Sequence, residues 1–449
     1  MFKEKYSQGK LLREKAPRVS HGKWGAPIGR PSVENMIAQS NYGRLEKLVP
    51  IRHFRMSKSP FSFYRGTASL MARDLSFTPS SGIQVQACGD CHLMNFGGFA
   101  TPERTLVVDI NDFDETNPAP WEWDLKRLAT SFVLACRDKG MSESDGLDVT
   151  MAAVSSYREK MNEYATMNFL DLWYSKLTLE EIGRTAKTKE GKERVAKAIA
   201  KANDQTHDTV FYKITRETLG KIEITDQTPL IYHPLNVEES MQRIMAFMDQ
   251  YKSTMQYDRK LLLDNYHIVD VALKVVGVGS VGTRCLVALM MNDNQEPLFL
   301  QVKEAQPSVL EQFTTPSEFK HAGERVVQGQ RLIQSASDVF LGWATDREGR
   351  CYYLRQLRDK KMSVRLEQFS KGLLVSYAHI CGNILARAHC KTAQGPFICG
   401  YMGKKDVFAK AICQFATGYA DQTERDYNDF MRAIKAGKLE ITDDTPKEI

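Results

Sequence analysis

The sequence lacks any long run of apolar residues. No stretch of its 449 residues reaches the length of a membrane-spanning helix, about 20 residues, so we expect no membrane span. The first thirty residues also lack the apolar centre of a signal peptide. Nine cysteines, an odd number without a disulfide-framework spacing, indicate free thiols in a reducing compartment. We therefore expect a cytoplasmic protein.

Clusters of histidine and cysteine are also missing. The nine histidines are scattered singly, and residues 88–92, Cys-Gly-Asp-Cys-His, contain the only C-x-x-C motif. This stretch fits haem c attachment, zinc binding or thiol redox chemistry. Haem attachment requires export, however, and a zinc site requires a second pair of ligands. The sequence meets neither requirement, so we do not favour these sites.

Positive charge is in excess only at the amino terminus. Residues 1–30 contain eight Lys or Arg and two Glu, a difference of six that equals the whole formal net charge of +6. The rest of the chain is nearly neutral and shows no basic face with interleaved aromatic residues, so no nucleic-acid partner is expected. We predict a basic, flexible arm over residues 1–30.

Acidic residues gather at the ends of two predicted strands. Ile83, Val85 and Ala87 alternate with polar residues, and residues 106–110 are an apolar β run. The oxygen ligands at these strands suit Mg²⁺ or Mn²⁺ better than zinc, and turn formation alone does not explain so many of them. They are Asp90, Asn95, Asp109, Asp112 and Asp114. From this set we predict Asn95, Asp112 and Asp114 as metal ligands. Which of Asp109, Asp112 and Asp114 bind the metal is left open.

A glycine-rich loop lies far downstream, between two β-rich segments. Its G-x-G-x-x-G pattern would open a helix in a dinucleotide-binding fold, with Glu304 as the ribose-binding acid. Residues 283–289 instead predict a short strand. Strand, glycine loop and strand are typical of the hairpin that covers nucleotide phosphates in kinases. The predicted nucleotide-binding residues of this loop are Gly277, Gly279, Ser280 and Gly282.

The next predicted strand carries a lysine in an otherwise apolar run. Lys303 resembles the V-A-I-K lysine that contacts ATP phosphates in kinases. A helix is predicted to begin at Thr315, with Pro316 in its first turn and Glu318 as capping partner. Glu324 on this helix is the expected ion-pair partner of Lys303.

The acidic stretch resembles the catalytic loop of kinases. Asp90 and Asn95 have the spacing D-x-x-x-x-N, in which the Asp orients the attacking hydroxyl and the Asn holds a metal ion. Residues 112–114, Asp-Phe-Asp, stand where D-F-G would. Gly-Asp-x-His-x-x-Asn is similar to the aminoglycoside-phosphotransferase branch, as is the downstream Asp124-Leu125. We therefore interpret Asp124 as a structural acid that braces the loop.

These elements occur in a rearranged order, because kinases place the glycine loop before the catalytic loop. The kinase order returns if the chain is read from about residue 266 and re-entered at its amino terminus. The strand at 351–357 then becomes the hinge, whose Gln356 and Leu357 would contact the nucleotide. Chain termini often lie close together, so such an order can build the same site. We predict an α+β fold, two-lobed and protein-kinase-like, circularly permuted, with a mainly helical insert.

Five segments follow from this interpretation. They are the arm at 1–30, the catalytic-loop and metal-site part of the large lobe at 31–150, a helical insert of that lobe at 151–265, the small β-rich nucleotide-binding lobe at 266–362, and the helical remainder of the large lobe at 363–449.

Longer motifs resemble the bacterial domain-of-unknown-function family 2252. They occupy residues 59–66, 88–97, 111–116, 120–129 and 300–305, and the resemblance spans most of residues 45–400. This family has no settled activity, so the resemblance supports the positions of the site more than its substrate. Tyr64 and Arg65, in the first motif, either line the site or are buried structural residues.

The expected function is ATP- and Mg²⁺-dependent phosphoryl transfer to an unidentified hydroxyl-bearing small molecule or protein. Asp90, Lys303 and Glu324 are the predicted catalytic residues. AMP transfer on the same fold, a two-metal phosphoesterase and a nucleotide-binding pseudokinase stay open as alternatives. The phosphoesterase lacks its G-N-H-[DE] segment here, and the joint presence of Asp90, Asn95, Asp112 and Lys303 argues against a pseudokinase. The oligomeric state is not readable.

Overall fold

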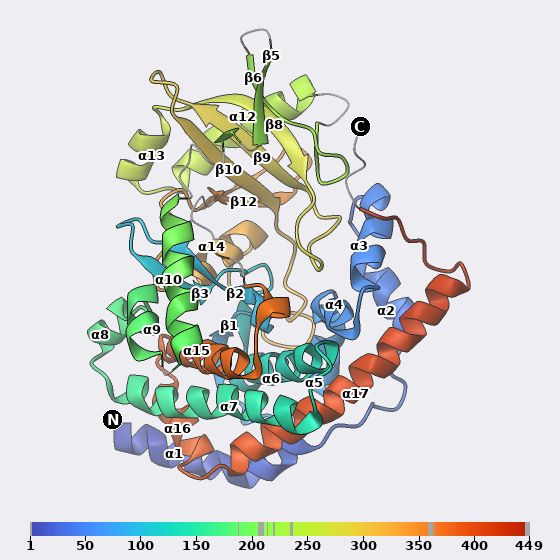
Figure 1. The fold of residues 1–449 in the computed structure, drawn as a ribbon, viewed down its shortest axis with the longest axis vertical. Helices are drawn as coiled ribbons and strands as arrows, with labels where there is room; N and C mark the ends of the chain where they lie inside the picture. Colours follow the sequence, from blue (N-terminus) through green and yellow to red (C-terminus); the bar gives the residue numbers. More distant parts are fainter. Residues whose placement is uncertain are drawn as a thin grey trace.

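A six-stranded antiparallel sheet lies above a larger assembly of helices in the computed structural model (Figure 1). The predicted α+β class is therefore confirmed. The structure describes residues 2–186, 188–204, 211–212, 214–218, 221–233, 237–357, 362 and 364–444.

The sheet has the strand order β11-β12-β10-β9-β8-β7, and every neighbouring pair is antiparallel. The strands are β7 (Ile231–Tyr232), β8 (His267–Lys274), β9 (Cys285–Met291), β10 (Pro297–Glu304), β11 (Gly342–Thr345) and β12 (Cys351–Gln356). The predicted strand, glycine loop and strand are β8, the loop at 275–284 and β9. Seven of the eight residues of β10 are buried, because both faces of the sheet are covered.

Helices α12 (Val237–Ser253) and α13 (Tyr257–Leu263) accompany the sheet, and the hairpin of β5 (Thr215–Thr218) and β6 (Lys221–Ile224) packs beside it. Phe247 of α12 stacks on Tyr352 of β12, with ring centroids 5.8 Å apart. Ile224 of β6 shares a second apolar cluster with Val287 of β9. The sheet part therefore includes described residues well before 266, where the sequence predicted an insert of the large lobe. The apolar faces of α12 and of the β5–β6 hairpin pack on the sheet. The charged sequence of α10, just upstream, gave no indication of this packing.

Helix α14 (Ala322–Ile333) follows β10 and packs on β11 and β12. It begins seven residues later than the predicted start at Thr315. His321 is the N-cap, since its Nδ1 accepts the backbone N–H of Glu324 at 3.1 Å. The Thr315 carbonyl is held instead by the side-chain amide of Asn117, at 2.9 Å. This contact keeps the preceding segment out of the helix.

The helical part surrounds α6, whose residues from Trp121 to Cys136 are all buried. Its other long helices are α7 (Glu143–Thr166), α10 (Lys189–Asp204), α15 (Lys371–Cys390) and α17 (Val407–Lys435). Its short helices are α2 (Val33–Ser40), α3 (Val49–Met56), α4 (Pro60–Arg65), α5 (Ala68–Ser76), α8 (Phe169–Tyr174), α9 (Leu179–Thr185) and α16 (Gly395–Met402). Helices α7 and α15 cross closely at Gly382, where a Cβ atom would lie 2.2 Å from the carbonyl oxygen of Ala153.

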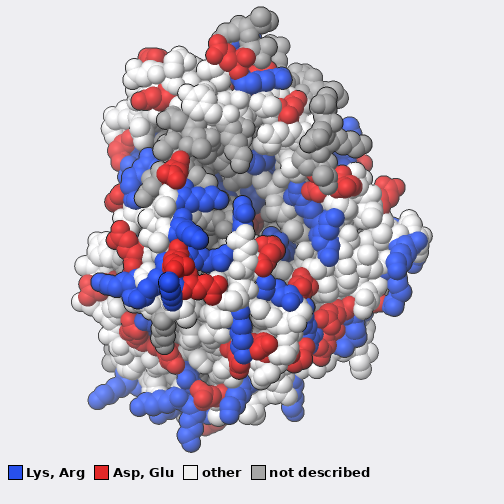
Figure 2. Space-filling view, in the orientation of Figure 1, with Lys and Arg blue, Asp and Glu red and all other residues white. Residues whose placement is uncertain are grey.

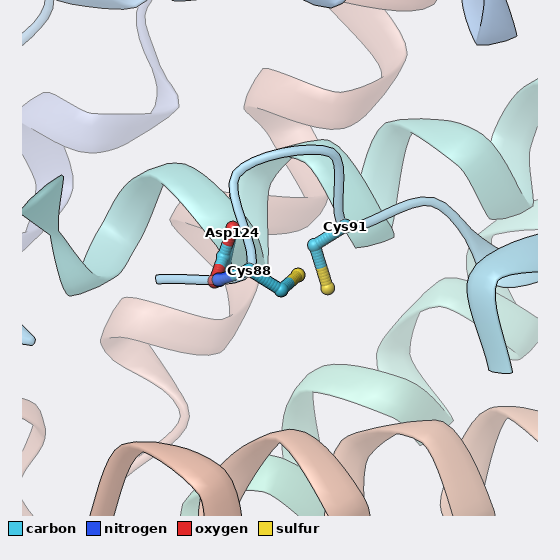
Figure 3. A group of neighbouring side chains, drawn as sticks. All are labelled: Cys88, Cys91 and Asp124. Carbon is cyan, nitrogen blue, oxygen red and sulfur yellow. The ribbon is translucent and has the colours of Figure 1, made fainter. Parts of the chain in front are cut away.

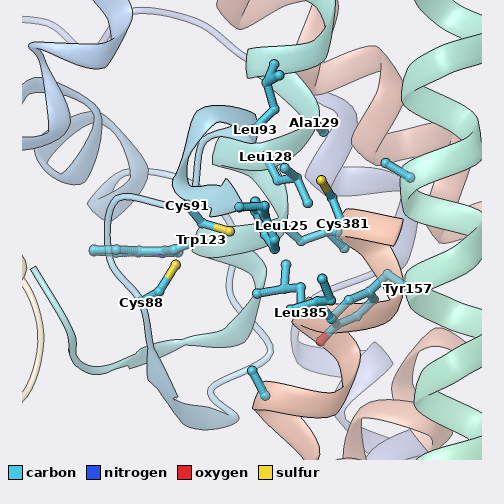
Figure 4. Close-up of a cluster of buried hydrophobic side chains, with 14 of the residues drawn as sticks. Cys88, Cys91, Leu93, Trp123, Leu125, Leu128, Ala129, Tyr157, Cys381 and Leu385 are labelled. Atoms are coloured by element: carbon cyan, nitrogen blue, oxygen red, sulfur yellow. The ribbon is translucent and has the colours of Figure 1, made fainter. Parts of the chain in front are cut away.

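Two small hairpins frame the acidic loop. Strand β1 (Gln84–Ala87) pairs with β4 (Asn117–Pro120), and β2 (Phe96–Ala100) pairs with β3 (Leu106–Ile110). The loop at 88–95 therefore leaves β1 and enters β2, above a buried apolar cluster (Figure 4). In that cluster the side chains of Cys88, Cys91 and Leu93 share the core with residues of α6 and α15. This core fixes the base of the loop.

The basic arm predicted to be mobile begins with an ordered helix. Helix α1 (Phe2–Lys15) lies along α16, and the Arg13 side chain donates to the Tyr401 carbonyl at 2.9 Å. A Cβ atom at Gly400 would lie 2.0 Å from the carbonyl oxygen of Tyr6, so only glycine permits this approach. The prediction of a flexible arm was wrong because charge density alone does not reveal such a contact.

The nine cysteines are all free thiols, and only Cys351 is not fully buried. Across the parts of the chain that the structure describes, no helix combines the length and apolar character needed to cross a membrane.

Candidate functional site

Lys303 of β10 forms an ion pair with Asp114, which lies between β3 and β4. The other oxygen of Asp114 accepts the hydroxyl of Tyr353 on β12 at 2.8 Å. Ser280 of the glycine loop donates its hydroxyl to Asp114 Oδ2 at 3.3 Å. The glycine loop, the lysine strand and the acidic segment are thus in direct contact around one carboxylate.

Burial and charge act against each other in this pair. The Lys303 side chain is 3% exposed and that of Asp114 is 24% exposed. Burial by itself lowers the pKa of Lys303, but Asp114 reverses this and holds that pKa well above its usual value. Burial likewise raises the pKa of Asp114, and the Lys303 ammonium and Tyr353 hydroxyl bring it below its usual value. Both groups are therefore charged at neutral pH.

The expected ion pair between Lys303 and Glu324 is not formed. Glu324 falls in the first turn of α14, because that helix begins later than predicted. The next residue, Arg325, is the one that enters the site: its guanidinium donates to the carbonyl oxygens of Asp114 at 2.8 Å and Thr116 at 2.6 Å. Helix α14 thus binds the backbone of the acidic segment through Arg325. Its Glu324 does not pair with Lys303.

Asp90 is held by an arginine of α6. The Nε atom of Arg127 donates to Asp90 Oδ1 at 2.6 Å, and a second nitrogen of the same guanidinium lies 2.5 Å from that oxygen. Tyr64 lies against Arg127, 4.4 Å from ring centroid to guanidinium, and donates its hydroxyl to the Arg127 carbonyl. Tyr64 is therefore a buried residue that positions Arg127. Burial raises the pKa of Asp90, and Arg127 only partly opposes this.

Asp124 braces the loop from below, as its sequence context predicted. Its two oxygens accept the backbone N–H groups of Cys88 at 2.8 Å and Gly89 at 3.0 Å (Figure 3). His389 of α15 lies 3.2 Å from the same carboxylate through Nε2. These contacts fix the two residues that precede Asp90.

Cys88, Cys91 and Asp124 offer ligand atoms within 4.8 Å of one another. The carboxylate is already occupied by backbone donors and His389. Burial raises the pKa of Cys91 to about 11 and that of Cys88 well above its usual value, so both thiols stay protonated. Cys88 and Cys91 pack in the apolar core beside the acidic loop, and Asp124 holds the backbone of that loop.

Asn95 and Asp112 carry two of the side-chain oxygens that the sequence assigned to a cation. The side-chain nitrogen of Asn95 donates to the Asp90 carbonyl at 2.6 Å, which leaves Oδ1 as the atom available to a ligand. The N–H of Asn111, next to Asp112, donates to the Asn95 carbonyl at 3.0 Å. Burial raises the pKa of Asp112, as do the charges of Asp114 and Asp90, against the opposing charges of Lys303 and Arg355. A divalent cation would relieve this repulsion, so the donor set fits Mg²⁺.

Asp109 belongs to a different, structural contact. It is fully buried, and both of its oxygens accept from Arg387 of α15, at 2.6 and 2.8 Å. The N–H of Ser335 adds a third contact at 2.7 Å. Both carboxylate oxygens of Asp109 are thus used in a structural contact.

The glycine loop is held by two arginines from the amino-terminal part of the chain. Arg44 donates to the Val281 carbonyl at 2.6 Å and Arg55 to the Gly277 carbonyl at 2.5 Å. Gly277 and Gly282 have positive φ angles of 68° and 93°. On the face seen in Figure 2, lysine and arginine side chains gather beside a recess in the middle of the molecule.

The predicted hinge residues lie at the end of β12. The N–H of Gln356 donates to Asp338 Oδ2 at 2.7 Å, and that of Leu357 donates to the Phe299 carbonyl at 2.8 Å. Both backbone donors are thus used within the sheet part. Gln356 also lines a cavity of about 550 Å³ between the β2–β3 hairpin and α13, away from Lys303 and Asp114.

Several site residues were not predicted from the sequence. Arg127 lies in the same motif as Asp124, at residues 120–129, and Arg325 directly follows Glu324. Tyr353 lies in the predicted hinge strand, and the register of β12 against β10 places it opposite Lys303. Only the pairing of β12 with β10 identifies Tyr353 as a neighbour of Lys303.

A family model described as "Uncharacterized protein conserved in bacteria (DUF2252)" matches residues 44–433. No curated protein matches the chain. No solved structure matches it either.

Proposed function

Since the chain belongs to this family of uncharacterized bacterial proteins, whose description names no activity, we propose a function from the site: ATP- and Mg²⁺-dependent phosphoryl transfer to a hydroxyl-bearing acceptor. The observation that carries the proposal is the meeting of Ser280, Lys303 and Asp114 beside Asp112 and Asp90. A glycine loop, a buried lysine and converging carboxylates are the parts that phosphoryl transfer needs.

The element order of the sheet part supports a circularly permuted, protein-kinase-like fold. A glycine hairpin (β8–β9) is followed by the lysine strand β10, the helix α14 and the strands β11 and β12. In kinases the glycine-rich loop, the strand lysine and the αC helix follow one another in this way. The acidic loop then comes from the amino-terminal half, as a permuted chain requires.

Lys303 would bind nucleotide phosphate in exchange for Asp114. In the structure Asp114 balances the buried ammonium, and phosphate oxygens would take over that task. The available oxygens of Asn95 and Asp112 would hold Mg²⁺, which supplies neutralisation of the phosphate charge. Ser280, already at Asp114, places the glycine loop over the same point.

Asp90 would orient the acceptor hydroxyl and accept its proton. Arg127 fixes one carboxylate oxygen, so the carboxylate has a defined orientation. Burial raises the pKa of Asp90, which is the direction that makes a carboxylate a better base. Asp124 and the core below it keep the loop in place during turnover.

ATP labelled separately at the α- and γ-phosphates tests the proposal. The full chain is incubated with each label, Mg²⁺ and a mixture of hydroxyl-bearing metabolites and proteins, next to Asp112→Asn. Asp258→Asn, at an exposed site outside the acidic segment, is the matched control. We expect transfer of the γ label by the wild type and the control and its loss in Asp112→Asn.

The other outcomes identify the competing functions. Transfer of the α label would establish AMP transfer on the same site. Cleavage of a generic phosphate ester with Mn²⁺ and without ATP would establish a phosphoesterase. Tight ATP binding without transfer of either label would establish a pseudokinase. Label transfer that persists in Asp112→Asn would overturn the metal assignment.

A further inference from the structure

Arg65 is the last residue of α4 and lies beside the candidate site, outside the glycine loop, the lysine strand and the acidic segment. Its backbone carbonyl supports the glycine loop, since a Cβ atom at Gly279 would lie 3.1 Å from it. Its guanidinium interacts electrostatically with Asp90 and Asp112, which oppose the effect of burial on its pKa. The same cation, after burial, lowers the pKa of His92 in the acidic loop. Arg65 is thus placed against the loop, the base and the predicted metal ligand.

Among the residues that the structure describes, the guanidinium of Arg65 has no hydrogen-bond or ion-pair partner. Its Nε atom is buried without a hydrogen bond, and within the described residues the side chain forms neither a hydrogen bond nor an ion pair. Its neighbours differ: Arg55 donates to Gly277, Arg127 to Asp90, and Arg325 to Asp114. Arginine side chains that are largely buried are normally paired, because removing an unpaired charge from water is unfavourable. An unpaired guanidinium beside two carboxylates points to an anion that completes the site.

The position of Arg65 defines which anion this is. In the proposed reaction Asp90 meets the acceptor oxygen and Asp112 meets Mg²⁺, while Gly279 covers the phosphates. Arg65 adjoins the glycine loop through its backbone carbonyl and acts on both carboxylates through its charge, so it lies where the phosphoryl group passes from donor to acceptor. Arginine is suited to this task, since its planar donors match phosphate oxygens.

We propose that Arg65 is a catalytic residue that binds the phosphoryl group in transfer and stabilises its charge in the transition state. This inference rests on the proposed function. In the step, the bond between the γ-phosphorus and the β,γ-bridging oxygen of ATP breaks and its electron pair leaves with ADP. A bond forms between the acceptor oxygen and the γ-phosphorus, and the acceptor proton passes to Asp90. Arg65 donates to the equatorial oxygens throughout and exchanges no proton.

The experiment compares ground-state and transition-state binding in the full chain. A fluorescent ADP analogue reports binding of MgADP, with and without aluminium fluoride, which imitates the transferring phosphoryl group. Release or transfer of γ-labelled phosphate from ATP reports turnover. The variants are Arg65→Ala and Arg65→Lys, and Arg73→Ala is the matched control. Arg73 on α5 also has a buried Nε atom without a partner, but it is not among the charges that act on Asp90 or Asp112.

We expect Arg65→Ala to bind MgADP within twofold of wild type and to lose the tightening by aluminium fluoride. Turnover should fall by about 10²–10³-fold, the size of effect seen when one charge-stabilising donor is removed. Arg65→Lys should keep part of both effects, and it supplies the answer if Arg65→Ala does not fold. Arg73→Ala should match wild type in every measurement.

Two results would overturn the role of Arg65. One is turnover within threefold of wild type in both Arg65 variants. The other is an equal loss of MgADP and MgADP–aluminium fluoride binding, which would show uniform binding rather than transition-state stabilisation. Failure of the wild type itself to bind MgADP or to turn over ATP would overturn the proposed function instead, so the two failures are distinguishable.

Discussion

Lys303 and Asp114, 189 residues apart in the sequence, form the ion pair that joins the sheet part to the acidic segment. The same carboxylate accepts from Tyr353 and Ser280, so three elements of the sheet part converge on it. Such a carboxylate fixes Lys303 in a charged, buried state before any phosphate is present. In the proposed function, the phosphate would replace this carboxylate beside Lys303.

Lys303→Met should leave Asp114 without its cation and lower the free energy of unfolding by about 2 kcal/mol. The loss stays below the ~3–5 kcal/mol of a fully buried pair because the Asp114 side chain is 24% exposed. Asp114→Asn should be destabilising as well, and the double variant should lose less than the sum of the two. Urea unfolding of all four proteins measures this. Strict additivity would contradict a coupled pair.

Asp112→Asn should stabilise the metal-free protein at pH 7. Burial, Asp114 and Asp90 raise the pKa of Asp112 in the folded state, against Lys303 and Arg355. The stability that this carboxyl contributes is fully present below its unfolded pKa, about 3.9, and is lost as pH rises through the folded pKa. Asparagine has no such loss, so the Tm advantage of the variant should grow from pH 4 to pH 7.

Two controls accompany this pH series. Asp109→Asn should be destabilising at pH 7, because it breaks the buried pair with Arg387. Millimolar Mg²⁺ should raise the Tm of the wild type and leave that of Asp112→Asn unchanged. A variant that is no more stable than wild type at any pH would refute the crowding of these carboxylates.

Much of the site was readable because its residues lie at the ends of strands. The alternation at 83–87 and the apolar run at 106–110 located β1 and β3, and the acids followed from them. The strand, glycine loop and strand at 267–291 were equally clear, because each strand is apolar and the loop is not. Such local patterns are readable because the same residues that form the pattern also form the strand.

The partners of these residues were not readable, because they depend on tertiary contacts. Nothing in the spacing of Lys303 distinguishes Asp114 from Glu324, and the choice follows from where α14 begins. The aspartates at 109, 112 and 114 cannot be told apart from the sequence. In the structure, Asp109 pairs with Arg387 and Asp114 pairs with Lys303. The density of charge at the amino terminus likewise predicted a flexible arm. In the structure, α1 packs closely on α16 at Gly400.

Asp124→Asn should destabilise the loop that carries Asp90. An asparagine offers one acceptor where the backbone N–H groups of Cys88 and Gly89 need two, and its amide would face a donor. We expect a loss of about 2–3 kcal/mol in the free energy of unfolding, the cost of leaving buried donors unsatisfied. Asp148→Asn, which breaks only an exposed contact with Lys371, should cost under about 0.5 kcal/mol. Equal effects of the two variants would mean that Asp124 does not brace the loop.

Gly89→Ala should disturb the site far more than Gly349→Ala, although both glycines have positive φ angles, 84° and 79°. Both variants carry the cost of an L side chain in this conformation, about 1–2 kcal/mol. At Gly349 nothing lies within 4 Å of the new Cβ, whereas at Gly89 it would lie 2.1 Å from the Glu115 carbonyl oxygen. That contact must push the acidic segment away from Asp90, so γ-phosphate turnover should fall at least tenfold in Gly89→Ala and stay near wild type in Gly349→Ala. Thermal unfolding and turnover measured on the same samples separate strain from displacement, and equal turnover in the two variants would show that the contact between residues 89 and 115 does not set the geometry of the site.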